Sequence, residues 1–185
     1  MLAAAAIAAQ TLRDPVWEPP IAHAALVLVF TRKAEALLYP RPFAQTSLAN
    51  LGAHYKEAFT EPPLFDAHAP AFEWDHDPWT INVIGHGLLG SELYVRARAC
   101  RFGWGGALAF TTAATITWEY LVEGNGTRPS AEDLVYTPLA GLVLGEARYF
   151  GWRAAQRIAS PAGRAVLSAL LDPFGELERA TVFPC

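Results

Sequence analysis

The stretch that decides the fold is "WEYLVEGNGTRPSAEDLVYTPLAG", residues 118–141. It carries five charged residues between two apolar segments: Glu119, Glu123, Arg128, Glu132 and Asp133. Within "RPSAED", Ser130 is followed three residues later by Asp133, which is the spacing of a capping box at a helix N-terminus. The stretch therefore predicts two helices that meet at a Gly-Asn-Gly turn, with the charge gathered at their junction.

Outward from this turn, the apolar pattern predicts helices along most of the chain. Their expected ranges are residues 21–39, 46–59, 79–100, 104–123, 130–157 and 161–171. Residues 60–79, "TEPPLFDAHAPAFEWDHDPW", have no helical period and predict an irregular Pro- and aromatic-rich connector that lies on the surface or caps a site. Strand-like alternation and internal repeats are absent from the sequence. We therefore expect an all-α fold, a compact helical bundle with one irregular connector.

Small residues predict where two of these helices approach each other closely. Thr137, Gly141 and Gly145 recur at intervals of four, which forms a small-residue ridge along one helix face. Gly90 lies one turn beyond His86 in an earlier helix and gives similar close access. These four positions, Gly90, Thr137, Gly141 and Gly145, are the expected helix-packing contacts.

Polar residues follow one face of the helix expected at 104–123. Thr112, Thr115, Glu119 and Glu123 are spaced by three, four and four residues, so they share that face. A buried carboxylate must be neutralised, paired or hydrogen-bonded. We therefore expect Glu119 to point inward, whereas Glu132, in the first turn of the next helix, is expected to point to water.

Several polar residues are candidates for one buried network that joins three helices. The expected members are Asn82, His86, Arg98, Glu119, Glu123, Arg128, Ser130 and Asp133. Within this set, His86 or Arg128 is the expected partner of Glu119. His86, Glu119 and Asp133 are also the catalytic candidates, if the protein is an enzyme. Asp75 and Asp77, in "DHD", are interpreted as solvated loop residues.

The composition is poor in charge. Charged residues make up 17% and apolar residues 52% of the chain, whereas soluble domains average about 25% charged residues. The net charge of -4 gives no basic patch for nucleic acid. The longest uncharged run is seventeen residues, 102–118, and a membrane span needs about 20 apolar residues. A membrane-associated bundle without a simple span is the expectation.

The terminal segments and the two cysteines indicate how the chain is organised into domains. Residues 1–10, "MLAAAAIAAQ", resemble a truncated signal segment without its basic start, or else an Ala-rich terminus. Residues 11–185 are expected to form a single helical domain, with most motifs between about residues 70 and 178. Cys100 and Cys185 lie 85 residues apart without a CxxC, and so indicate neither a zinc site nor a disulfide framework.

Three segments together resemble a known bacterial family. They are "DPWTINVIGHGLLGSELYVRAR" (77–98), "WEYLVEGNGTRPSAEDLVYTPLAGLVLGE" (118–146) and "LLDPFGEL" (170–177). Their motifs are similar to the family catalogued as domain of unknown function 3943, apart from Gly87, where that pattern has proline. A looser similarity is to VanZ-like membrane proteins and small envelope lipoproteins. The resemblance implies the bacterial cell envelope, on the inner membrane or on the periplasmic side of a membrane, and implies no particular reaction.

Two classes of function follow from these patterns. The first is a non-enzymatic, membrane-associated envelope protein, with the polar network as a structural lock and with membrane lipid or another membrane protein as partner. The second is an envelope enzyme, such as a metal-dependent hydrolase, that acts on a lipid or lipid-linked substrate. The sequence contains neither HExxH nor GxSxG. We expect no cofactor, no metal and no nucleic-acid partner.

Overall fold

The computed structural model describes residues 14–45, 47–179 and 185. The expected signal segment at residues 1–10 lies outside these residues. The described chain is all-α, as the sequence predicts, and its one β-bridge joins Leu64 to Ser130. It begins with α2 (Glu18–Leu38), the short α3 (Pro40–Phe43) and α4 (Leu48–Thr60), which are followed by the irregular connector.

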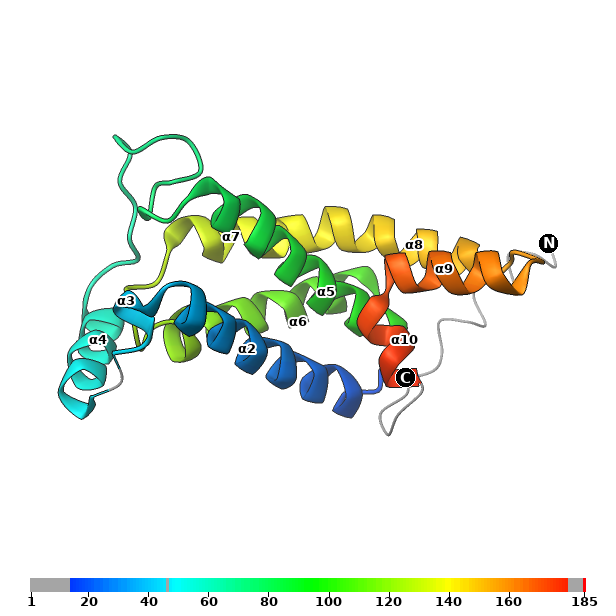
Figure 1. Ribbon diagram of the computed structural model, residues 1–185, viewed down its shortest axis with the longest axis horizontal. Helices are drawn as coiled ribbons and strands as arrows, with labels where there is room; N and C mark the ends of the chain where they lie inside the picture. Colours follow the sequence, from blue (N-terminus) through cyan, green and yellow to red (C-terminus); the bar gives the residue numbers. More distant parts are fainter. Residues whose placement is uncertain (1–13, 46, 180–184) are drawn as a thin grey trace.

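The second part of the chain forms the body of the bundle. Its elements are η1 (Thr80–Gly85) and α5 (His86–Ala99), α6 (Trp104–Thr117) and η2 (Trp118–Val122), α7 (Ala131–Ala140), η3 (Gly141–Gly145) and α8 (Glu146–Ala155), α9 (Pro161–Leu171), and α10 (Pro173–Arg179). In Figure 1, α2 follows one long side and α7 with α8 the other, with α5 and α6 between them. The connector and α4 lie at one end, and α9 and α10 at the opposite end.

Three of the predicted helices contain a π-helical segment that the sequence pattern did not indicate. The segments η1, η2 and η3 lie before α5, after α6 and between α7 and α8. A π-helical turn holds more residues than an α-helical turn, and such turns occur frequently at functional sites. Two further short helices, α3 and α10, were also not predicted.

The helix α5 is the centre of the bundle, and its close contact with α7 and η3 depends on glycine. A Cβ atom added to Gly90 would lie 2.1 Å from the carbonyl oxygen of Thr137, and one added to Gly141 would lie 2.8 Å from that of Gly90. One added to Gly145 would lie 2.8 Å from Cβ of Tyr94. The ridge of Thr137, Gly141 and Gly145 therefore lies against α5.

The connector is fastened across the turn that precedes α7. Leu64 donates its N–H to the carbonyl of Pro129 (2.7 Å) and accepts the N–H of Ala131 (3.0 Å). Further along, the N–H of Trp74 reaches Oε2 of Glu132 at 3.3 Å. The connector thus covers the N-terminal end of α7 and brings residues 72–77 against the bundle.

A disulfide joins Cys100, at the end of α5, to Cys185, with their Cα atoms 4.7 Å apart. The expectation that these cysteines are not part of a disulfide framework is therefore wrong for this pair. Sequence separation did not reveal it, because only the fold brings two positions 85 residues apart together.

None of the helices in residues 14–45 and 47–179 combines the length and hydropathy that a membrane crossing requires.

Candidate functional site

A cluster of acidic side chains lies where the connector, α2, η2 and the start of α7 meet. We call it the carboxylate cluster, and its members are Glu35, Asp75, Asp77, Glu119, Glu123, Glu132 and Asp133. These carboxyl groups influence one another electrostatically, and most are buried or half-buried. The cluster explains why charged residues are concentrated in residues 118–141. The acidic side chains at the junction of η2 and α7 lie against acidic side chains from α2 and from the connector.

Glu119 lies within the π-helical segment η2 and points inward, as expected, with only 1% of its surface exposed. Its Oε2 accepts the backbone N–H of Ser130 at 2.8 Å, whereas its Oε1 has no hydrogen-bond partner. The expected ion pair with Arg128 is not formed in the described part of the chain, where Nε of Arg128 has no hydrogen-bond partner. Glu119 instead lies close to His86.

His86 is held between two residues of α7. Its Nδ1 lies 2.8 Å from the hydroxyl of Thr137, and its Nε2 lies 3.5 Å from Oδ2 of Asp133. The backbone N–H of Asp133 is in turn capped by Oγ of Ser130 at 3.1 Å, so the cap predicted from the sequence is present. The start of α7 therefore positions both Asp133 and the imidazole of His86.

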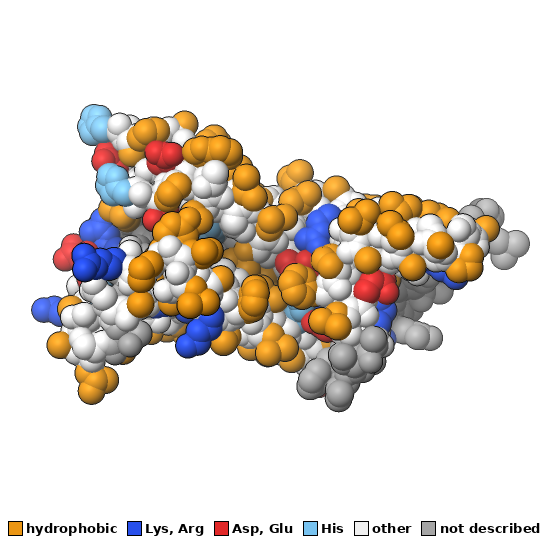
Figure 2. All heavy atoms as spheres, viewed as in Figure 1, with side chains coloured by type: hydrophobic (Ala, Val, Ile, Leu, Met, Phe, Trp, Pro, Cys, Tyr) orange, Lys and Arg blue, Asp and Glu red, His pale blue; other side chains and the backbone are white. Residues whose placement is uncertain are grey.

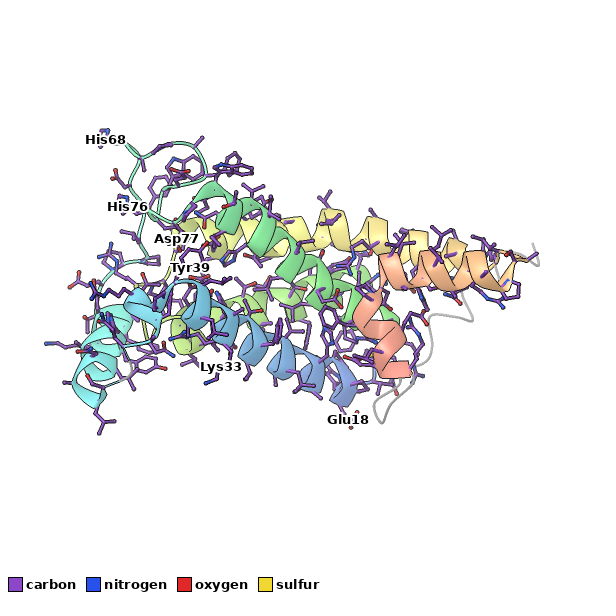
Figure 3. The ribbon with its side chains drawn as sticks, viewed as in Figure 1. Glu18, Lys33, Tyr39, His68, His76 and Asp77 are labelled. Atoms are coloured by element: carbon purple, nitrogen blue, oxygen red, sulfur yellow. A yellow bond between two sulfur atoms is a disulfide. The ribbon has the colours of Figure 1, made fainter. Side chains whose placement is uncertain are left out.

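Asp75 belongs to this site, so its interpretation as a solvated loop residue is wrong. Its Oδ1 accepts a hydrogen bond of 2.7 Å from the amide of Asn82, which also donates to the carbonyl of Phe72 at 3.0 Å. Asp77 is half-buried, whereas His76 and His68 extend from the connector into solvent, as Figure 3 shows. The sequence offered one indication that Asp75 is bound to the bundle: Asn82, its hydrogen-bond donor, follows only seven residues later.

Glu132 is 6% exposed, so the expectation that it points to water is also wrong. The connector folds over the first turn of α7, and the N–H of Trp74 binds this carboxylate. Burial raises the pKa of Glu132, and the hydrogen bond from Trp74 opposes that rise.

Arg98 lies away from the carboxylate cluster. Its guanidinium pairs with both oxygens of Glu146, at 2.9 and 3.0 Å, and stacks on Tyr149. Arg32 of α2 and Arg41 lie beside the cluster. Burial raises the pKa of Glu35 to about 7, and the charge of Arg32 opposes that rise. Arg32 itself donates to carbonyl oxygens of Val122 and Phe43 and to the side chain of Asn125. The positive charge next to the cluster is thus far smaller than its acidic content.

Burial changes the protonation of this site. Burial, together with neighbouring carboxylates, raises the pKa of Glu119 to about 8 and that of Asp133 to about 10. Burial raises the pKa of Glu123 well above its usual range, and lowers that of His86 to about 4. For Asp75, burial is outweighed by hydrogen bonds that hold its pKa below the usual value. Near neutral pH the site contains a neutral imidazole and several protonated carboxyl groups, unless a cation compensates them.

Three of these side chains could hold a metal ion. One ligand atom each from His86, Glu119 and Glu123 lies within 4.8 Å of the others. A small cavity of about 110 Å³ lies beside them and is lined by Glu123, Glu35, Asp77 and six other residues. A neutral imidazole and two carboxylates are common ligands of divalent transition metals.

The raised pKa of Glu119 leads to a prediction about stability that tests whether this side chain is buried in its protonated form. Replacing it by glutamine is expected to leave the chelator-treated protein at least as stable as the wild type at pH 7. The folded-state pKa of about 8 lies above the ordinary 4.5. The wild type therefore loses stability as pH rises through this interval, and the variant lacks that loss. Urea unfolding at pH 5 and pH 8, with Glu57→Gln on the exposed face of α4 as the control, measures the difference. A deficit in Glu119→Gln that grows with pH would contradict the assignment.

A second buried polar group, which the sequence interpretation missed, lies at the opposite end of the bundle. We call it the C-terminal ion-pair network, and its members are His23, Glu92, Arg96, Arg148, Asp172, Glu178 and Arg179. Arg96 and Asp172 are both 0% exposed, and Arg148 binds Glu92 at 2.6 Å. Asp172 also accepts the N–H of Gly175 at the start of α10. The motif "LLDPFGEL" gave an indication of the role of Asp172, because this aspartate precedes a proline and a glycine that form the turn.

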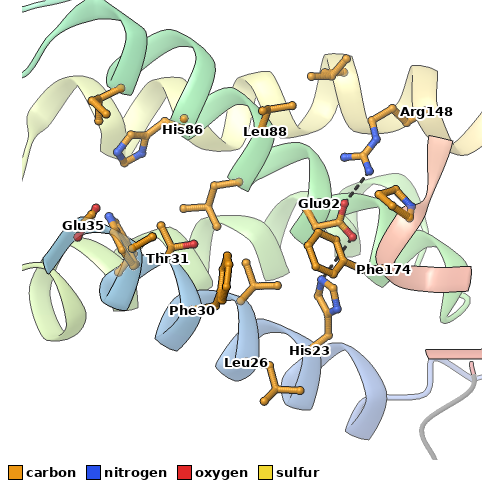
Figure 4. Close-up of a pocket in the computed structure, with 18 of the residues that line it drawn as sticks. His23, Leu26, Phe30, Thr31, Glu35, His86, Leu88, Glu92, Arg148 and Phe174 are labelled. Atoms are coloured by element: carbon orange, nitrogen blue, oxygen red, sulfur yellow. Dashed lines mark hydrogen bonds and ion pairs between the residues drawn. The ribbon is translucent and has the colours of Figure 1, made fainter. Parts of the chain in front are cut away.

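An apolar groove runs between these two polar groups. It has a volume of about 1010 Å³ and is lined by α2, α5, α8, α9 and α10. In Figure 4, Leu26, Phe30 and Leu88 line its middle, with His86 and Glu35 at one end. His23 with Glu92 and Arg148 lies at the other end.

Comparison with known proteins places the chain in one family. Residues 71–174, more than half of the chain, match the family described as Domain of unknown function (DUF3943), so the protein belongs to that family. This confirms the resemblance drawn from the three motif segments. No curated protein and no solved structure matches the chain.

Proposed function

We propose that the protein is a non-enzymatic, membrane-associated component of the bacterial envelope that binds one acyl chain of a membrane lipid in the apolar groove. The groove carries this proposal. Its volume of about 1010 Å³ is at the upper end of the roughly 300–1,000 Å³ of ligand pockets, and its lining is mostly apolar. An unbranched hydrocarbon chain fits a long apolar groove whose few charged groups lie toward its ends.

The surface around the groove supports attachment to a membrane. Large apolar side chains on its walls are exposed to solvent, among them Leu26, Phe30, Leu170 and Leu177. Figure 2 shows hydrophobic side chains over much of the same face, with charged groups in small patches. Exposed apolar patches of this kind mark membrane or protein interaction sites. Attachment through this face requires no membrane-spanning helix.

Placement in the envelope has separate support. Disulfides persist in oxidising compartments, such as the bacterial periplasm, and are rare in the cytosol. The bond between Cys100 and Cys185 therefore favours an extracytoplasmic location.

The carboxylate cluster has a structural role in this proposal. Glu119 of η2 binds the N–H of Ser130, His86 of α5 contacts α7, and Asn82 of η1 holds Asp75 of the connector. These contacts restrict the relative positions of three helices and the connector, because each hydrogen bond forms in only one packing arrangement.

Lipid binding is tested by flotation with vesicles of zwitterionic and anionic phospholipid. The wild type is expected to float with the vesicles, and Leu26→Glu and Leu177→Glu are each expected to weaken binding by about tenfold or more. Burying a leucine side chain contributes about 1.5–3 kcal/mol, and about 1.4 kcal/mol corresponds to tenfold. Leu48→Glu is the matched control, because Leu48 is exposed on α4 outside the groove.

Equal flotation of all three variants would show that the groove is not the lipid site. If the wild type stays in solution with every vesicle composition, membrane association itself is wrong.

One observation favours an envelope enzyme as the second candidate function. His86 lines the groove and also belongs to the carboxylate cluster, so a lipid in the groove would lie next to groups able to move a proton. Mass spectrometry of lipids incubated with the wild type and with His86→Gln distinguishes the two functions. Hydrolysis products that require His86 would favour the enzyme.

A further inference from the structure

The carboxylate cluster places one nitrogen and two carboxylate ligands around a common point. His86 is the first residue of α5, Glu119 lies in η2, and Glu123 follows directly after η2. Their ligand atoms lie within 4.8 Å of one another. Ligands that share one zinc-sized ion at about 2.0–2.2 Å are separated by at most about twice that distance. Only a small inward movement separates the three side chains from a coordination sphere.

A buried carboxylate without a partner points to a ligand at this place. Glu123 is 4% exposed, and it lies beside Glu119 in the same cluster. The Oε1 atom of Glu119 is buried and has no hydrogen bond within the described residues. Buried polar groups in native proteins are nearly always satisfied by protein, water or an ion. The unsatisfied oxygen of Glu119, with His86 and Glu123 beside it, therefore points to a ligand such as a cation at this place.

The surrounding charge favours a cation over a neutral donor. Glu35, Asp75, Asp77 and Asp133 are further acidic groups around the three ligands, because each acts electrostatically on Glu119 or Glu123. Arg32 lies at the edge and is hydrogen-bonded to carbonyl oxygens and to Asn125, and Arg41 lines the small cavity, so the acidic groups still outnumber the arginines. A bound divalent ion would supply the largest local positive charge and would favour ionised carboxylates.

Neighbouring groups already orient the ligands as metal sites require. The hydroxyl of Thr137 binds Nδ1 of His86, which leaves Nε2 facing the cluster. The N–H of Ser130 binds Oε2 of Glu119. Hydrogen bonds of this kind fix the tautomer and direction of a ligand. The cavity of about 110 Å³ beside Glu123 has room for water, which would complete the coordination.

We propose that His86, Glu119 and Glu123 bind one divalent transition-metal ion of the zinc or manganese class. The histidine nitrogen separates this class from calcium and magnesium, which take oxygen ligands. The site is independent of lipid in the groove, although His86 is common to both.

The test is titration of the chelator-treated full chain with Zn²⁺ and separately with Mn²⁺, followed by calorimetry and thermal unfolding. The wild type is expected to bind one equivalent at this site and to unfold at a higher temperature with metal. Glu123→Gln and Glu119→Gln are each expected to weaken that binding by at least about 100-fold, since even outer-shell changes reduce metal affinity by about 10–100-fold.

Two control variants distinguish the loss of a metal ligand from a general loss of negative charge. Glu132→Gln removes a buried acid of the same cluster outside the three ligands, and Glu57→Gln removes an exposed acid of α4. Both are expected to keep the affinity within a few-fold of the wild type, because neither provides a ligand. Substitution with Co²⁺ should give a visible absorption band that His86→Gln changes.

Binding that survives both Glu119→Gln and Glu123→Gln would overturn the proposal, as would the absence of binding of either metal to the wild type. Since both variants remove a buried acid without changing its shape, their folding is checked by circular dichroism before titration. Vesicle flotation of Glu123→Gln should equal that of the wild type. A failure of the metal site therefore leaves lipid binding untouched, and a failure of lipid binding leaves the metal result standing.

Discussion

Replacing Arg96 by methionine is expected to lower the free energy of unfolding by about 3–5 kcal/mol. Arg96 is 0% exposed, and its guanidinium lies 3.7 Å from Oδ1 of Asp172 and 3.1 Å from Oε2 of Glu178. Methionine fills much of the same volume but leaves the buried charge of Asp172 with less compensation. Arg179 still pairs with Asp172 at 3.0 Å, and this favours the lower end of the range.

Urea unfolding of Arg96→Met beside the wild type measures this loss. Arg157→Met is the matched control, because Arg157 is exposed at the end of α8, and its change should remain within about 0.5 kcal/mol. The double variant Arg96→Met with Asp172→Asn should recover part of the loss, since it removes the stranded charge. A single variant as stable as the wild type would show that the C-terminal ion-pair network contributes nothing to the fold.

Gly90→Ala is expected to cost about 3 kcal/mol or more, which is large for the addition of one methyl group. The new Cβ would lie 2.1 Å from the carbonyl oxygen of Thr137 and 3.1 Å from its Cγ2. The nearest atom belongs to the backbone of α7, so a rotamer change cannot relieve the contact, and the two helices must separate.

Gly87→Ala is the control for Gly90→Ala on the same helix. A Cβ at Gly87 would meet only the side chain of Tyr136, at 3.4 Å. Alanine is favoured over glycine in a helix by about 0.5–1 kcal/mol, so this variant should be neutral or slightly more stable. Thermal unfolding that ranks Gly90→Ala level with Gly87→Ala would mean that α5 and α7 are not in close contact.

The features that the sequence predicted are those that depend on local pattern. Apolar periodicity indicated the long helices, and the cap at Ser130 indicated the start of α7 to within one residue. The ridge of Thr137, Gly141 and Gly145 indicated a close helix contact, because steric access is a property of residue size. Within the candidate site, burial of Glu119 followed from its place on the stripe of an apolar helix.

The features that were missed depend on contacts between distant segments. Glu132 and Asp75 are buried because the connector folds against α7, and nothing in the first turn of a helix shows that a chain 58 residues earlier will cover it. Arg98 was assigned to the polar network from its motif, yet its position on α5 faces Glu146. The C-terminal ion-pair network and the disulfide join positions that have no local relation. These contacts could not be read from periodicity.

The π-helical segment η3 sets the rotational phase between α7 and α8. Each residue of an α-helix advances the chain by about 100° around the axis. Suppose that one residue of 141–145 were deleted and that α7 and α8 then formed one continuous α-helix. Every side chain of α8 would be rotated by about 100° around the helix axis relative to α7. Arg148 would then leave Glu92, and Glu146 would leave Arg98, while Thr137 remained on α5. Because of this one irregular turn, α7 contributes side chains to the carboxylate cluster, while α8 contributes side chains to the opposite end of the groove.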